Sequence, residues 1–254
     1  MKRRSLFYSF LILFCFLNEA FVFAKPFSVS FFTNERPKIS LSQRFEYNFM
    51  HGAKYENSGF STVAALDADE LLVIGGFNAN TKSTDIAFQA YYAPCFWNLV
   101  SVGVSAKYHY YKYSDNFAGL NEELFSEHNV LPGAFIRFNL NDVWNLYFNA
   151  GGLYKFTVFP DYPHNAHMND NTLFFNTGCI FTPTDNWRFF IDFGNCSLFD
   201  DCLLGNFKFD LGFSYRVWQR LWFGSELIFG WTDASVPQDS FSHFGIRTSW
   251  GVKF

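Results

Sequence analysis

The sequence has no apolar run long enough to cross a membrane as a helix. The one candidate, Leu6 to Leu17, is only twelve residues long, whereas a spanning helix needs about 20 apolar residues. Charge is also scarce, because 17% of the residues are charged and the formal net charge is −4. A nucleic-acid partner is therefore not predicted, since such proteins usually carry a basic stripe. A helical membrane protein is also disfavoured.

The N-terminus is typical of a secretory signal peptide. A basic start, Lys2 to Arg4, precedes the apolar run, and Val22 and Ala24 lie three and one residues before a cut after residue 24. We predict that residues 1–24 are removed. Their loss takes the formal charge from −4 to −6, because they carry three basic residues and Glu19. Residues 25–37 are predicted to form a periplasmic lead, and residues 38–254 a single domain.

Cysteine is sparse, with five in the chain, and Cys15 would leave with the signal peptide. Cys196 and Cys202 lie close together in one predicted loop, so they are candidates for a disulfide in an oxidising exterior compartment. Cys95 and Cys179 lie in distant segments and are expected to stay unpaired. The spacing of the cysteines is not typical of a metal site.

Aromatic residues are abundant, at 22% of the chain with 37 Phe. In water, so many exposed rings would form association-prone patches. From Lys38 onward, apolar residues recur at every second position in segments of about ten residues, which is the signature of a membrane β-barrel. In the last segment one parity is apolar and the other polar or small: Phe244, Ile246, Thr248, Trp250, Val252 and Phe254 against His243, Gly245, Arg247, Ser249, Gly251 and Lys253.

The end of this segment resembles the terminal strand of bacterial outer-membrane β-barrels. In those proteins an aromatic last residue on the membrane-facing parity closes the barrel and is read by the insertion machinery, a role that the resemblance assigns to Phe254. The resemblance implies an all-β, closed antiparallel up-and-down barrel of the small-porin kind. It also implies the outer membrane of a diderm bacterium as location, with outer-membrane lipid and the barrel-insertion machinery as partners.

Links between the alternating segments fall into two kinds. Short turns are predicted at residues 97–98, 141–143, 183–186 and 218–220. Longer polar links are predicted at residues 112–129, 159–170, 195–205 and 232–242. Short turns are typical of the periplasmic end and long loops of the extracellular end.

The strand count depends on residues 51–83. As one loop they give ten strands, but a structureless loop this long and this apolar is evidence against that assignment. As strands at about 59–67 and 70–78, around a turn at residues 67–70, they give twelve strands. We choose twelve, with ten as the alternative.

Most tryptophans flank the predicted short turns or the chain end. Because indole rings prefer the headgroup region, these residues predict a membrane-interface belt of Trp97, Trp144, Trp187, Trp218, Trp222 and Trp250. Trp231 falls at the opposite rim. The alternative is a soluble sandwich in which Trp packs the strand ends.

Charged residues on the inward parity are predicted to line a pore: Arg44, Glu46, Lys107, Arg137, Lys155, Arg188, Asp192, Lys208, Asp210, Arg216, Glu226 and Arg247. With Lys253 and Asp85 the inward set is nine basic and five acidic residues, and the remaining acid, Glu127 included, is expected in loops. A basic interior favours anions. We therefore predict a passive channel for small solutes with a weak anion preference.

A plugged structural barrel is the main alternative, because ion pairs across the lumen can fill a small barrel. Eight strands leave an interior filled by side chains and 16–18 leave a channel, so twelve strands do not decide between the two. Inward Phe135, Phe174, Phe190 and Trp222 would narrow any path. A surface adhesin using the long loops is a further alternative.

An outer-membrane lipid-modifying enzyme is less favoured. Ser242 and His243 are neighbours in a strand and so point to opposite faces, which does not make a nucleophile and its base. No catalytic residue and no cofactor are predicted. Asp161, His164, His167 and Asp170 carry possible metal ligands, but Pro160 and Pro163 oppose the helix that would align them. No metal site is predicted.

Overall fold

The computed structural model describes residues 38–50, 57–68, 71–80, 83–96, 99–115, 122–141, 143–159, 166–196, 198–199, 206–232 and 241–254. The predicted signal peptide and lead, and Trp97, lie outside these residues. In the described part of the chain, no helix is long and apolar enough to cross a membrane.

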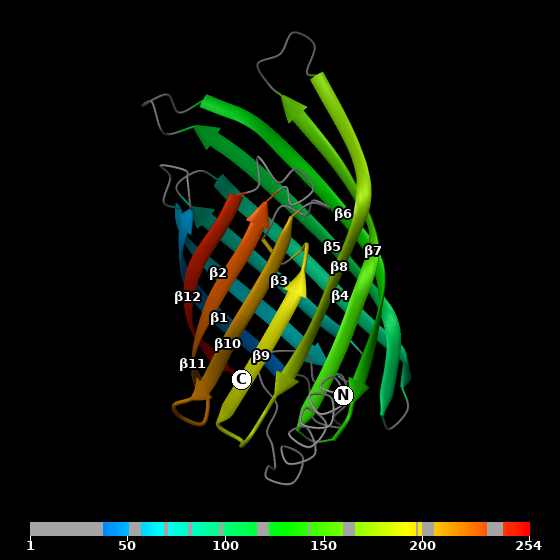
Figure 1. The fold of residues 1–254 in the computed structure, drawn as a ribbon, viewed down its shortest axis with the longest axis vertical. Helices are drawn as coiled ribbons and strands as arrows, with labels where there is room; N and C mark the ends of the chain where they lie inside the picture. Colours follow the sequence, from blue (N-terminus) through cyan, green and yellow to red (C-terminus); the bar gives the residue numbers. More distant parts are fainter. Residues whose placement is uncertain are drawn as a thin grey trace, which may run out of the picture.

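Within these residues, twelve strands form one closed antiparallel barrel (Figure 1). They are β1 (Lys38–Met50), β2 (Asn57–Ala68), β3 (Leu71–Asn80), β4 (Ser83–Phe96), β5 (Val100–Asp115), β6 (Glu122–Asn139), β7 (Trp144–Phe159), β8 (Ala166–Phe181), β9 (Trp187–Gly194), β10 (Phe207–Arg216), β11 (Leu221–Thr232) and β12 (Phe241–Lys253). Each strand pairs with its sequence neighbours, and β1 pairs with β12 to close the ring. The predicted fold class and the count of twelve are confirmed.

The region of uncertain count forms the hairpin of β2 and β3. The ten-strand alternative is wrong, because these strands pair with each other from Gly59 opposite Asn80 to Ala68 opposite Leu71. Both of their faces are apolar because the interior is itself apolar here. Leu72 is buried in a cluster with Ala93 and Phe135, so the inward parity carries hydrophobic residues as well.

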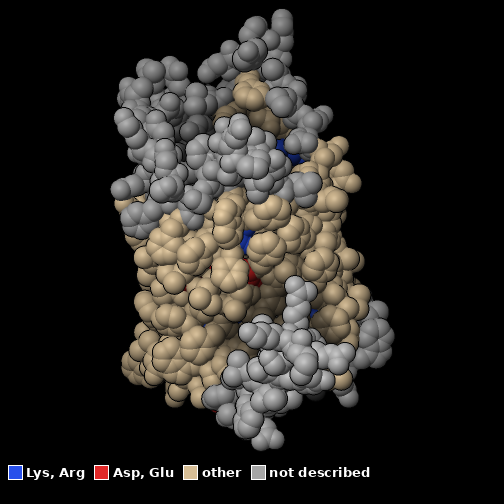
Figure 2. Space-filling view, viewed as in Figure 1, with Lys and Arg blue, Asp and Glu red and all other residues tan. Residues whose placement is uncertain are grey.

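Alternate side chains of β12 point to opposite sides of the wall, as the sequence predicts. Ile246 and Trp250 are 38% and 53% exposed, whereas Gly245 and Gly251 are buried. Phe254 continues the ladder, since its backbone N–H donates to the carbonyl of Ile39 at 2.7 Å. Exposed apolar side chains cover the outer surface, and only a few charged atoms show on the face in Figure 2.

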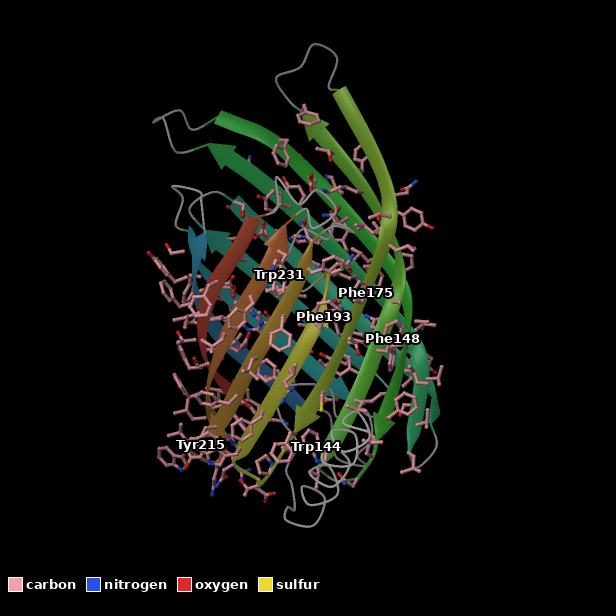
Figure 3. All side chains as sticks on the ribbon, viewed as in Figure 1. Trp144, Phe148, Phe175, Phe193, Tyr215 and Trp231 are labelled. Atoms are coloured by element: carbon pink, nitrogen blue, oxygen red, sulfur yellow. The ribbon has the colours of Figure 1, made fainter. Side chains whose placement is uncertain are left out.

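Tryptophans collect on the outer surface near the short turns. Trp144 lies at that end in Figure 3, whereas Trp231 lies farther along the wall. Trp187, Trp218 and Trp250 are exposed, and Trp144 is half-buried. Whether they occupy the membrane interface stays a prediction.

Trp222 does not belong to this outer belt. Its side chain is only 6% exposed, while its neighbours Leu221 and Phe223 are exposed on the outer surface. Its ring lies 5.9 Å from the guanidinium carbon of Arg216, an inward residue at the rim. A position next to a short turn does not by itself place a Trp on the outer surface, because strand parity decides which side of the wall a residue faces.

Side-chain hydrogen bonds explain two of the short turns. Asn141 Oδ1 accepts from the backbone N–H groups of Val143 and Trp144, at 2.9 and 2.8 Å. Thr184 Oγ1 accepts from Asn186 and Trp187 in the same way, at 3.3 Å each. Asn and Thr favour turns because they can bind the backbone a few residues along the chain.

Strand lengths differ strongly around the barrel. β5 to β8 have 16 to 18 residues, whereas β9 has eight. Figure 1 shows β6, β7 and β8 reaching beyond the ends of their neighbours. The predicted loops at 112–129 and 159–170 were therefore too long. Ladder hydrogen bonds continue where the strands leave the apolar band, although the apolar alternation that marks a strand in the sequence fades there.

Candidate functional site

The inward charged residues lie in the barrel interior, on the parity opposite to the exposed apolar side chains. Lys107, Arg137, Lys155, Arg188 and Asp210 are buried, with Lys107 only 4% exposed. Partly buried are Arg44, Glu46, Asp192, Lys208, Arg216, Glu226 and Arg247. That solutes pass along these side chains stays a prediction.

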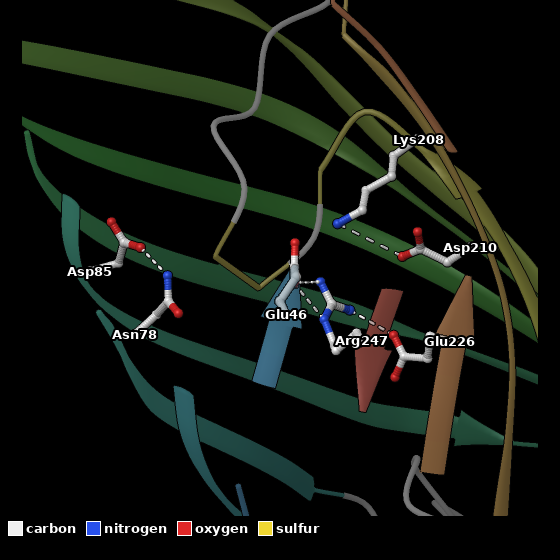
Figure 4. Close-up of polar contacts among 7 residues, drawn as sticks. All are labelled: Glu46, Asn78, Asp85, Lys208, Asp210, Glu226 and Arg247. Atoms are coloured by element: carbon white, nitrogen blue, oxygen red, sulfur yellow. Dashed lines mark hydrogen bonds and ion pairs between the residues drawn. The ribbon is translucent and has the colours of Figure 1, made fainter. Parts of the chain in front are cut away.

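Arg247 on β12 joins two neighbouring strands inside the barrel (Figure 4). Its Nη2 lies 2.6 Å from Oε2 of Glu46 on β1, and its Nη1 lies 2.7 Å from Oε2 of Glu226 on β11. Both carboxylates stand directly opposite Arg247 in the ladder register. This arrangement, which we call the closure clamp, spans the seam where the first and last strands meet.

A second ion pair lies on the long strands and was missed from the sequence. Nζ of Lys155 on β7 lies 3.0 Å from Oε2 of Glu127 on β6. Glu127 was expected in a loop, but β6 begins at Glu122 and carries it into the interior. This additional carboxylate lowers the predicted basic excess. Two further contacts are drawn in Figure 4: Lys208 with Asp210 at 3.9 Å, and Asn78 with Asp85 at 2.6 Å.

The chain turns into the barrel directly after β9. Asn195 binds the neighbouring strand β8, because its Oδ1 accepts from Phe175 N at 2.7 Å and its Nδ2 donates to Leu173 O at 2.9 Å. β9 pairs with β8 only from Phe181 to Asn176. Asn195 therefore hydrogen-bonds to backbone groups of β8 that have no β9 residue opposite them. The residues after Asn195 enter the interior.

Asn195, Cys196, Leu198 and Phe199, which we call the inner segment, cross the interior. Cys196 is buried with Leu131 and Leu153 of β6 and β7, and Lys107 of β5 donates to its sulfur at 3.2 Å. Phe199 packs on Gly76 of β3, since a Cβ added there would lie 2.5 Å from Cζ of its ring. β9 and β3 are six places apart in the ring of twelve, so the inner segment reaches the opposite wall.

Cys196 is disulfide-bonded and Cys179 is a free thiol. The side chains of Cys95 and Cys202 lie outside the described residues, so the pairing of Cys196 with Cys202 stays a prediction. We expect unreduced tryptic digests to contain the peptide 189–208 lacking both thiol hydrogens, as measured by mass spectrometry. Cys202→Ser should then expose a thiol at Cys196. Recovery of Cys196 linked to Cys95 would contradict this pairing.

A cavity of about 250 Å³ adjoins the inner segment. Cys196 and Leu198 contribute to its lining, and so do side chains from seven strands. Its charged lining residues are Arg137, Arg188, Lys208, Asp192 and Asp210. Three positive and two negative charges therefore surround one small space.

Other predicted features fall outside the described side chains. The side chains of Ser242 and His243 on β12 belong to this group, and so do those of Asp161, His164, His167 and Asp170. Among the described residues, no group of three or more His, Cys, Asp or Glu could hold a metal ion.

A closed antiparallel barrel with an apolar outside and a charged interior defines an outer-membrane β-barrel, whose outer surface requires lipid. The solved structures that share this fold include two porins. The KdgM porin has a TM-score of 0.52 and 9% identity, covering 84% of this chain and 99% of its own. The NanC porin has a TM-score of 0.53 and 10% identity, covering 84% and 100%. The chain thus has the outer-membrane barrel fold that these porins share.

Comparisons of the sequence itself find no relative. No family model matches the chain, and no curated protein matches it. At 9% and 10% sequence identity, the likeness to the two porins establishes the fold alone.

Proposed function

We propose that this barrel is a passive channel for small solutes with a weak preference for anions. The observation that carries the proposal is the charged cavity beside the inner segment, with Arg137, Arg188 and Lys208 against Asp192 and Asp210. Charges in a low-dielectric enclosure act on ions more strongly than the same charges in water. Because the cavity's net charge is a single positive unit, the selectivity is weak. No catalytic step is part of the proposal.

The inner segment limits the size of the solute. It crosses from β9 to β3, so any path along the barrel must pass it. The same observation favours the second candidate, a structural barrel whose lumen is plugged. Conduction separates the two candidates, because a plugged barrel carries no current.

Reversal-potential measurement in planar bilayers under a KCl gradient tests the channel. We expect a modest anion preference, and we expect the double variant Arg137→Gln, Arg188→Gln to become cation-preferring, because the lining then carries one positive and two negative charges. Arg220→Gln is the matched control, since Arg220 is exposed in a short turn. Heat-modifiable gel migration checks folding. A wild-type barrel that is silent or cation-selective overturns the proposal.

A further inference from the structure

Two unlike walls enclose the cavity beside the inner segment. One wall is apolar and aromatic, formed by Ile74 of β3, Tyr91 of β4 and Phe135 of β6. The rings of Tyr91 and Phe135 meet edge to face, with centroids 5.5 Å apart and planes at 83°. Aromatic rings favour edge-to-face and offset contacts with further rings. This wall therefore suits a planar aromatic ligand.

The other wall is charged. It consists of Asp192 on β9 and of Lys208 and Asp210 on β10. β4 and β10 are six places apart in the ring of twelve, so this wall faces the aromatic one across the interior. Because Lys208 lies 3.9 Å from Asp210, these two charges largely offset each other. A ligand in the cavity meets rings on one side and polar groups on the other.

Two arginines lie at the short-turn end of the cavity. Arg137 is near the end of β6, and Arg188 is the second residue of β9. Both are more than nine-tenths buried and both line the cavity. Phe190 supports Arg188, whose guanidinium carbon lies 5.3 Å from the ring centroid. A guanidinium fork matches the geometry of a carboxylate, which it can bind through two hydrogen bonds.

The size of the cavity restricts the ligand. An apolar cavity of about 150 Å³ binds one benzene molecule. The present cavity, at about 250 Å³, therefore accommodates a single ring with one or two small substituents. Larger fused or oligomeric solutes do not fit.

We propose that the cavity is a binding site for small single-ring aromatic carboxylates. The ring packs against Tyr91 and Phe135, and the carboxylate meets Arg137 and Arg188. This inference rests on the proposed channel function only in treating the bound acid as a permeating solute. It deepens that function by naming a solute class.

Benzoate is the probe for this site. In single-channel recordings we expect benzoate to interrupt the current at lower concentrations than two comparison compounds do. Cyclohexanecarboxylate keeps the charge without the aromatic ring, and benzamide keeps the ring without the charge. A hydrogen bond to a charged group contributes enough that Arg188→Gln should weaken the benzoate block about tenfold or more.

A matched pair of variants on β6 tests the aromatic wall. Phe135→Leu should reduce the preference for benzoate over cyclohexanecarboxylate. Phe138→Leu should leave it unchanged, because Phe138 is exposed on the outer side of the same strand. Equal block by the two acids, or no effect of Arg188→Gln, would overturn the assignment of the site.

Calorimetric titration of the whole barrel in detergent with benzoate separates this inference from the channel function. Benzoate binding to a barrel that carries no current would support the site and remove the channel. Ion conduction without benzoate binding would support the channel and remove the site. Heat-modifiable migration of each variant identifies those that fail to fold, and for these Arg188→Lys provides a milder change that should also lose affinity.

Discussion

Arg247→Leu is expected to destabilise the barrel by about 3–5 kcal/mol, the range for breaking a buried ion pair by removing one partner. Arg247 holds Glu46 and Glu226 at 2.6 and 2.7 Å, and its side chain is mostly buried. Without the guanidinium, Glu46 and Glu226 both lose the ion pairs that Arg247 makes with them inside the barrel. The lost ion pair with Glu46 spans the seam that joins β1 to β12, so the pairing that closes the barrel should be weakened most.

Urea unfolding in lipid vesicles, followed by tryptophan fluorescence, measures this loss. Arg220→Gln in an exposed turn should change the free energy of unfolding little. Adding Glu46→Gln and Glu226→Gln to the Arg247→Leu barrel should recover much of the loss, because the two partly buried carboxylates that lost Arg247 are then replaced by neutral amides. If Arg247→Leu alone is as stable as the unmodified protein, the closure clamp does not stabilise the barrel.

Phe199→Ala is expected to at least double the single-channel conductance. Phe199 is the residue of the inner segment that packs on the far wall, against Gly76. Removing its ring opens space on the β3 side of the interior. Because the narrowest section of the path limits the conductance, the wider passage should carry more current. Planar-bilayer recording at symmetric salt measures the change.

Two companion variants make this test specific. Gly76→Ala should not raise the conductance, because the new Cβ would lie 2.5 Å from Cζ of Phe199 and push the ring toward the interior. Phe148→Ala should leave the conductance unchanged, since Phe148 is exposed on the outer surface. If Phe199→Ala conducts as the unmodified barrel does, or if both are silent, the inner segment does not set the width of a channel.

Most of the fold could be predicted because strand parity is a local property. Successive side chains of a strand point to opposite faces, so apolar alternation alone identified β12, and the length and apolar character of residues 51–83 indicated the hairpin of β2 and β3. The prediction failed where the outer solvent changes from lipid to water. There both faces of a strand can be polar, and β6 was read as loop as far as Asn129.

The candidate site was only half predictable. Inward charged residues followed from parity, but their partners did not. The sequence placed Glu127 in a loop, whereas β6 brings it to Lys155. The inner segment carried no sequence signal beyond the close spacing of Cys196 and Cys202, because a loop that enters a barrel and one that leaves it differ little in composition.

By itself, the amino-acid sequence determined that this chain is a closed β-barrel with an apolar outside and a charged inside, and it favoured twelve strands over ten. That information is local, since it lies in residues two apart. Only the tertiary structure decided that Arg247 meets two carboxylates, that the chain after β9 crosses to β3, and that rings face charges across one cavity. Such contacts join residues distant in sequence, so they depend on ladder register and on closure of the ring.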